Sequence, residues 1–124
     1  MSESVLTVER SVDAPRRARA RVRRLEERLG PERTGDAVLL ISELVTNAVK
    51  YGPEQGEIQI IIDEREGGTR FTVHDTGAGP LPVMRPLERL PHQGGGHGLR
   101  LVELVSDRWG VERGSTRVWF ELDA

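Results

Sequence analysis

Two runs of apolar and β-branched residues, 57–63 and 69–75, lie close together in the chain and leave it little choice of topology. The connection between them contains Glu66-Gly67-Gly68, whose glycines can adopt the positive φ that a tight turn needs. Strands joined by so short a connection pair antiparallel, because a parallel pair needs a crossover of about a dozen residues or more. The sequence therefore predicts an antiparallel hairpin in the middle of the chain.

Helical periodicity precedes this hairpin. Residues 13–15, Asp-Ala-Pro, offer a cap and a proline suited to a first helical turn. A single apolar stripe then predicts one helix that ends at Gly30-Pro31, formed by Ala14, Ala18, Val22, Leu25 and Leu29. A second helix is predicted over about 31–51, where Gly52-Pro53 stops it.

Further strands are predicted near both ends of the chain. Val5–Arg10 forms an opening strand, and a short helix over 99–105 leads to closing strands at 109–112 and 117–122. Helices and strands are thus grouped and do not alternate. This order predicts a single α+β domain over residues 1–124, a two-layer sandwich with a mixed, mostly antiparallel sheet and helices on one face.

Composition excludes several functions. A formal net charge of −2 argues against electrostatic capture of nucleic acid, and the absence of cysteine excludes disulfides, thiolate catalysis and Cys-ligated zinc. No apolar run reaches the roughly 18 to 20 residues of a membrane span, and the N-terminus lacks a secretion signal. A cytoplasmic protein with no membrane partner is expected.

The second predicted helix carries a polar stripe at the edge of its apolar arc. Glu43, Asn47 and Lys50 follow one another at about one helical turn and share a face. A carboxylate, an amide and an ammonium so placed could hold hydrated Mg²⁺ and an anionic ligand. A solvated helix face, with Lys50 near the C-terminal dipole, explains the same spacing and is favoured by spacing alone.

Two glycine-containing segments are also compatible with ligand binding. Asp75-Thr76-Gly77-Ala78-Gly79 follows a predicted strand, so its carboxylate could accept a hydrogen bond from a ligand, although an Asx turn is equally compatible. Residues 94–98, Gly-Gly-Gly-His-Gly, precede a predicted helix and could present backbone N–H groups to a phosphate. They do not match the Walker A pattern, and a flexible linker is an equally good interpretation.

The order and spacing of these segments are similar to the motifs of the GHKL (Bergerat-fold) ATPase superfamily. Residues 43–49 resemble its N box, 75–79 its G1 box and 96–99 its G2 box, while 114–116 resemble its terminal Gly-Ser/Thr-Thr segment. Residues 42–48 and 101–110 look most like the actinobacterial serine-kinase anti-sigma factors.

This resemblance implies an ATP- and Mg²⁺-dependent serine protein kinase that phosphorylates an anti-anti-sigma (STAS-type) protein and so controls sigma-factor availability. It implies Glu43 as general base, Asn47 as the Mg²⁺ ligand and Asp75 as acceptor of the adenine amino group. The other implied nucleotide contacts are Lys50, Gly77, Gly79, Gly96, His97, Gly98, Leu99 and Thr116. A lid over about 80–97 would close over the nucleotide.

Three questions stay open at the level of sequence. The first is whether the protein is a kinase or a module that binds ATP and sequesters a sigma factor or another regulator without phosphoryl transfer. Such a module would need no general base. The arginine-rich first helix could bind nucleic acid, although the net charge and the few aromatic residues oppose this. This helix could instead be solvated or face a protein partner. The oligomeric state is the last question, and the resemblance implies a tendency to form homodimers.

Overall fold

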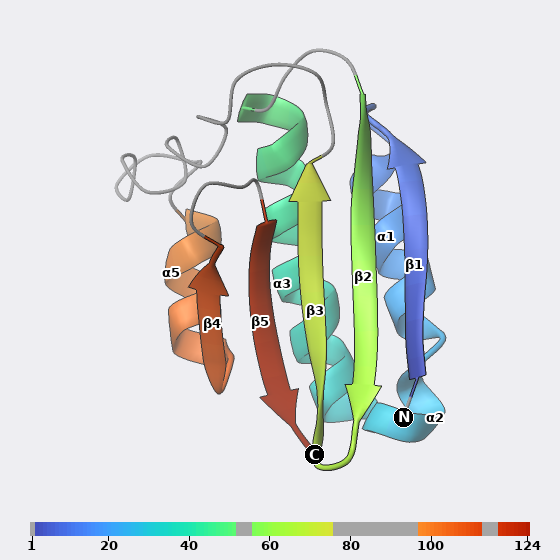
Figure 1. The fold of residues 1–124 in the computed structure, drawn as a ribbon, viewed down its shortest axis with the longest axis vertical. Helices are drawn as coiled ribbons and strands as arrows, with labels where there is room; N and C mark the ends of the chain where they lie inside the picture. The colour runs from blue at the N-terminus through green and yellow to red at the C-terminus, as the bar shows by residue number, and fades with distance from the viewer. Residues whose placement is uncertain (1, 52–55, 76–96, 113–116) are drawn as a thin grey trace.

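The computed structural model describes residues 2–51, 56–75, 97–112 and 117–124 (Figure 1). Along the chain its elements are β1 (Ser2–Glu9), α1 (Ala14–Arg23), α2 (Glu26–Leu29), α3 (Pro31–Tyr51), β2 (Glu57–Arg65), β3 (Gly68–Asp75), α5 (His97–Val105), β4 (Arg108–Val111) and β5 (Arg117–Asp123). The predicted limits of the long helix, 31–51, agree with those of α3.

The strands form one sheet in the order β1-β2-β3-β5-β4, and all four pairings are antiparallel. The predicted hairpin is confirmed as β2–β3, with Ile58 opposite Asp75 at one end and Arg65 opposite Gly68 at the other. Gly67 adopts a φ of 87° in the turn, a conformation that glycine adopts without steric cost.

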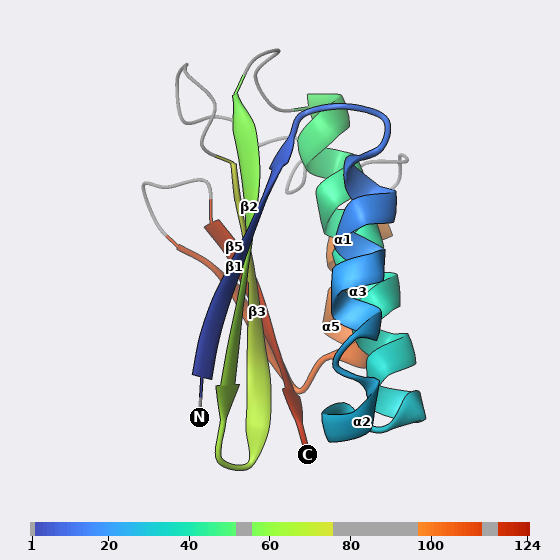
Figure 2. The same ribbon diagram turned by 90° about the vertical axis from the view of Figure 1, so that its right-hand side faces the viewer.

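The helices cover one face of the sheet, so the predicted two-layer α+β sandwich is confirmed (Figure 2). Alternate residues of the central strands point toward the helices, and the rings of Phe71 and Phe120 stack there with centroids 5.0 Å apart. The long helix α3 contributes buried Leu40, Ile41 and Leu44 to the same core. Within the described ranges, no helix is both long and apolar enough to cross a membrane.

The prediction of a single helix before Gly30 is wrong, because the helix breaks between α1 and α2. The backbone N–H groups of Arg24 and Leu25 bond to carbonyls three residues earlier, which tightens the last turn of α1. Leu25 nevertheless remains fully buried. The apolar stripe therefore identified the buried residues correctly and missed the change of direction.

The predicted cap at Asp13 is only partly right. Asp13 precedes α1 and Pro15 lies in its first turn, but the Asp13 side chain makes no capping hydrogen bond. Its carboxylate accepts a hydrogen bond from Arg16 Nη2 at 3.1 Å instead.

The arginines of the first helical region are divided between internal bridges and solvent. Arg19 donates to Ser42 Oγ on α3 at 2.9 Å, and Arg21 donates to Ser4 Oγ on β1 at 2.8 Å. Five others are exposed, namely Arg16, Arg17, Arg23, Arg24 and Arg28. The basic character of α1 thus serves packing within the domain as well as the surface.

Candidate functional site

The three residues of the polar stripe of α3 differ in burial. Glu43 is half-buried, Asn47 is only 3% exposed and Lys50 is exposed. Among the described residues, Asn47 Nδ2 has no hydrogen-bond partner. Buried polar groups are nearly always satisfied, so an amide in this position fits a site completed by a ligand better than a solvated helix face.

Asp75 is buried because of the strand that carries it. Alternation along β3 turns Thr69, Phe71, Val73 and Asp75 toward the helices, and Asp75 is the last residue of the strand, 5% exposed. The G1-box carboxylate predicted from the sequence therefore lies on the helix-covered face, at the end of the central hairpin that is far from its turn.

Arg10, which no sequence motif singled out, connects Asp75 to α3. Its Nη2 donates to Asp75 Oδ1 and its Nη1 donates to the backbone carbonyl of Ala48, the neighbour of Asn47. The side chains of Arg10 and Asp75 are 5% and 3% exposed. One guanidinium thus brings together the strand end and the helix segment that carry the two buried predicted site residues.

The N-terminal end of α5 lies at the same end of the molecule as the C-terminal ends of α3 and β3 (Figure 1). The first N–H groups of a helix have no intrahelical acceptors and attract anions. Leu99 is half-buried and packs against the core, which fixes this first turn. Helix α5 begins at His97, earlier than the predicted start at Leu99, so His97 and Gly98 lie in its first turn.

The remaining predicted contacts fall outside the described residues or have no described side chain. Gly77, Gly79, Gly96 and Thr116 belong to the first group, together with the predicted lid except for its last residue. His97 and Gly98 lie within α5, where the backbone is described and the side chain of His97 is not.

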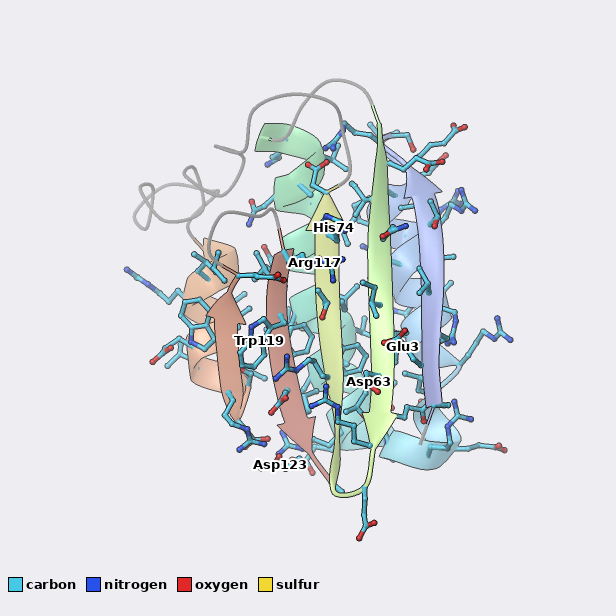
Figure 3. All side chains as sticks on the ribbon, in the orientation of Figure 1. Glu3, Asp63, His74, Arg117, Trp119 and Asp123 are labelled. Atoms are coloured by element: carbon cyan, nitrogen blue, oxygen red, sulfur yellow. The ribbon has the colours of Figure 1, made fainter. Side chains whose placement is uncertain are left out.

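The open face of the sheet carries charged groups of another kind. Burial and then the nearby charge of Arg117 lower the pKa of His74, and the two side chains project from neighbouring strands in Figure 3. Near the β2–β3 turn an arginine–carboxylate cluster borders an open hollow of about 210 Å³. It is lined by Arg65, Glu66, Gly67, Gly68, Thr69, Arg70, Arg108, Glu121 and Asp123. This hollow contains none of the predicted site residues.

The arrangement around Asn47 and Asp75 provides an amide, a carboxylate and a helix N-terminus at one end of the sheet. The described residues hold no group of three or more His, Asp or Glu side chains able to bind a metal. A divalent ion at Asn47 would therefore need oxygen atoms from water or from a ligand, as Mg²⁺ bound with substrate phosphates commonly has. The residues present fit a nucleotide that brings its own phosphate ligands.

Comparisons with known proteins agree with this fold. The chain is similar to a solved structure of the RsbU and RsbW domains of Rv1364c from Mycobacterium tuberculosis, with a TM-score of 0.68 and 22% sequence identity. That similarity covers 98% of this chain and 32% of the other, so the chain spans about a third of its solved neighbour. No curated protein sequence matches it.

The family comparison is more specific than the structural one. The model of the histidine kinase-like ATPase domain matches residues 8–122, a range that includes Arg10, Asn47, Asp75 and all of α5. The chain therefore belongs to the histidine kinase-like ATPase domain family.

Proposed function

We propose that the protein binds ATP with Mg²⁺ between the C-terminal ends of α3 and β3 and the N-terminus of α5, and transfers the terminal phosphoryl group to a protein serine. Asn47 would ligate the metal, and the Asp75 carboxylate would accept a hydrogen bond from the adenine amino group. The backbone of the first turn of α5 would donate to the phosphates. We also propose that residues 1–124 act as one domain, with a lid over about 80–97.

The observation that carries this proposal is the buried amide of Asn47. It is 3% exposed and its Nδ2 has no partner among the described residues. An unsatisfied buried donor costs about 1–3 kcal/mol. A phosphate oxygen would satisfy Nδ2 as an acceptor, while the metal would bind the amide through Oδ1. Asn47 also shares the last two turns of α3 with Ala48, which Arg10 joins to Asp75.

Glu43 supplies the group that distinguishes transfer from simple binding. It lies one helical turn before Asn47 and is half-buried, so a hydroxyl approaching the metal site from solvent could reach it. In phosphoryl transfer most of the catalysis is positioning and charge neutralisation, and a single carboxylate can orient the attacking hydroxyl and accept its proton. We assign that role to Glu43.

The proposed acceptor is a serine of an anti-anti-sigma protein of the STAS type, and a sigma factor is a second partner. Support comes from the likeness of segments 42–48 and 101–110 to serine-kinase anti-sigma factors and from the fold shared with a chain named for its RsbW domain. Binding of either partner would connect the nucleotide state of the domain to transcription.

Calorimetric titration with ATP, with and without Mg²⁺, tests the binding site. We expect Mg²⁺-dependent binding that Asn47→Ala abolishes. The matched control is Gln59→Ala, which removes an amide from the opposite face of the sheet, where Gln59 pairs with His74. Equal loss in both variants would show that Asn47 acts through general stability and would remove the metal-site assignment.

A transfer assay with anti-anti-sigma proteins from the same genome tests the reaction. Glu43→Gln should retain ATP binding and lose phosphorylation of the partner. Persistent phosphorylation would show that Glu43 is not the base. A wild-type protein that binds ATP and a partner without transfer would establish the sequestering module instead.

A further inference from the structure

We infer that Arg10 is a positioning residue for nucleotide binding. It holds the Asp75 carboxylate against the last turns of α3 and thereby sets the spacing between the adenine and the metal-binding parts of the site. The inference rests on the proposed function, because it takes Asp75 as the adenine acceptor. It adds a residue that lies outside every nucleotide-binding motif of the chain.

The first argument is the pair of contacts. Nη2 of Arg10 binds the carboxylate of Asp75 on β3, while Nη1 binds the carbonyl of Ala48 on α3. Ala48 directly follows Asn47, so the bridge joins the two proposed ligand-binding positions through one rigid, planar group. A guanidinium can hold two acceptors in a fixed geometry, whereas the ammonium of lysine is a point charge on a flexible stem.

The second argument is the acceptor on α3. The last four carbonyls of a helix have no partner within it, and Ala48 is the first of those four in α3, which ends at Tyr51. A positive group at this end of a helix is also favoured by the helix dipole. The Ala48 carbonyl therefore anchors Arg10, and through it the Asp75 carboxylate, to α3.

The third argument is burial. With side chains 5% and 3% exposed, Arg10 and Asp75 interact with little screening by water. Neither group can move away without leaving a buried charge behind, which costs far more than breaking a surface pair. The carboxylate is thus held in one place before any nucleotide arrives, and a preorganised acceptor does not have to be ordered on binding.

The experiment compares ATP with purine riboside triphosphate, which lacks the 6-amino group that Asp75 would bind. Affinities for both are measured by calorimetry in wild type, Arg10→Met and Arg10→Lys. We expect the wild type to prefer ATP, and Arg10→Met to lose about tenfold in ATP affinity with little change for the analogue. The ATP affinity of Arg10→Lys should lie between those of the wild type and Arg10→Met, because lysine keeps the positive charge and loses the bridge to two acceptors.

The matched control is Arg21→Met, which removes another arginine that donates to a side chain within the domain, at Ser4. It should leave the preference for ATP unchanged. A loss of affinity for both nucleotides in equal measure in Arg10→Met, or no loss for either, would overturn the positioning role. If Arg10→Met does not fold, Arg10→Lys decides, and an unchanged preference in that variant counts against the inference.

The failure of the proposed function gives a different result. A wild-type protein that binds neither nucleotide would refute the ATP site, and the inference with it. A wild type that binds both equally would remove the adenine role of Asp75. A wild type that prefers ATP, together with an Arg10 variant that keeps this preference, would refute the Arg10 inference alone.

Discussion

Two groups of arginine and carboxylate side chains lie toward opposite ends of the sheet and differ in their surroundings. The Arg10–Asp75 pair faces the helices and is almost fully buried. Glu121, on the open face, accepts from Arg70, Arg108 and Arg65, whose side chains are 32%, 54% and 47% exposed. The first group is buried, whereas the second is a network in contact with water.

This difference separates two uses of the same chemistry. Exposed ion pairs contribute about 0–1 kcal/mol, since water and salt screen them. A buried pair contributes little relative to apolar residues, but loss of one partner strands the other charge. The buried pair lies next to Asn47, whose Nδ2 has no partner among the described residues, and it is costly to break. The open-face network can change at small cost.

The largest predicted effect is the loss of one buried partner. Asp75→Ala should lower the free energy of unfolding by about 3–5 kcal/mol, because the Arg10 charge stays buried without a counter-charge. Urea unfolding measures this. The double variant Arg10→Met/Asp75→Leu should recover most of the loss, and a double variant as unstable as the single one would contradict this explanation.

A packing change on the open face should have a smaller effect. A Cβ at Gly110 would lie 2.9 Å from the ring of Trp119, over which Arg70 stacks at 3.9 Å. Gly110→Ala should cost about 1 kcal/mol, at the low end for overpacking because this half-buried ring can shift toward solvent. Tryptophan fluorescence should report the shift, and urea unfolding the cost.

Gly35→Ala is the control for that substitution, since Gly35 lies within α3 and a Cβ there would have no neighbour within 4 Å. It should stabilise the protein by about 0.4–1 kcal/mol. Destabilisation by both variants would mean that the contact with Trp119 is not the cause.

Neutralising the centre of the exposed network should matter less. Glu121→Gln removes a carboxylate that binds three arginines, yet we expect a loss below about 1 kcal/mol because each pair is partly exposed. Unfolding in low and high salt measures it, and the loss should shrink in high salt. A loss as large as that of Asp75→Ala would remove the distinction between the two ends.

The smallest effect is the pH dependence of stability. Burial lowers the pKa of His74, so the unfolded chain binds more protons below the ordinary histidine pKa of about 6.5, and stability falls as the pH drops from there toward the folded pKa. The hydrogen bond from Arg108 lowers the pKa of Glu121. The stability that ionised Glu121 contributes is therefore lost only as the pH falls below about 4.3. His74→Gln should remove the fall in stability below about pH 6.5 that comes from His74, and should leave the fall below about pH 4.3 unchanged. Thermal unfolding measured across pH tests this.

The sequence predicts elements whose causes are local and misses contacts between distant residues. The limits of α3 follow from a continuous apolar arc between Pro31 and the Gly52-Pro53 stop, and the hairpin follows from Gly67. The break after Arg23 depends on bonds to carbonyls three residues back, for which the apolar spacing carries no signal.

The candidate site shows the same limit. The helical wheel brings Glu43, Asn47 and Lys50 together, but only packing decides that Asn47 is buried and Lys50 exposed. The bridge from Arg10 to Asp75 spans 65 positions along the chain. Helix and strand periodicity predicts contacts only between residues that are close in the sequence, and a lone arginine after a strand gives no indication of its partner.

Both chain ends lie beside the β2–β3 turn (Figure 1). Ser2 is paired opposite Glu64, and the N–H of Ala124 donates to the carbonyl of Gly67 at 2.9 Å. Asp75 is at the other end of the eight-residue β3, about 25 Å away. An affinity tag, a surface linker or a fused reporter at either end would therefore leave the Asn47–Asp75 end open, which makes the domain suitable for immobilisation on sensor chips and for tandem fusions.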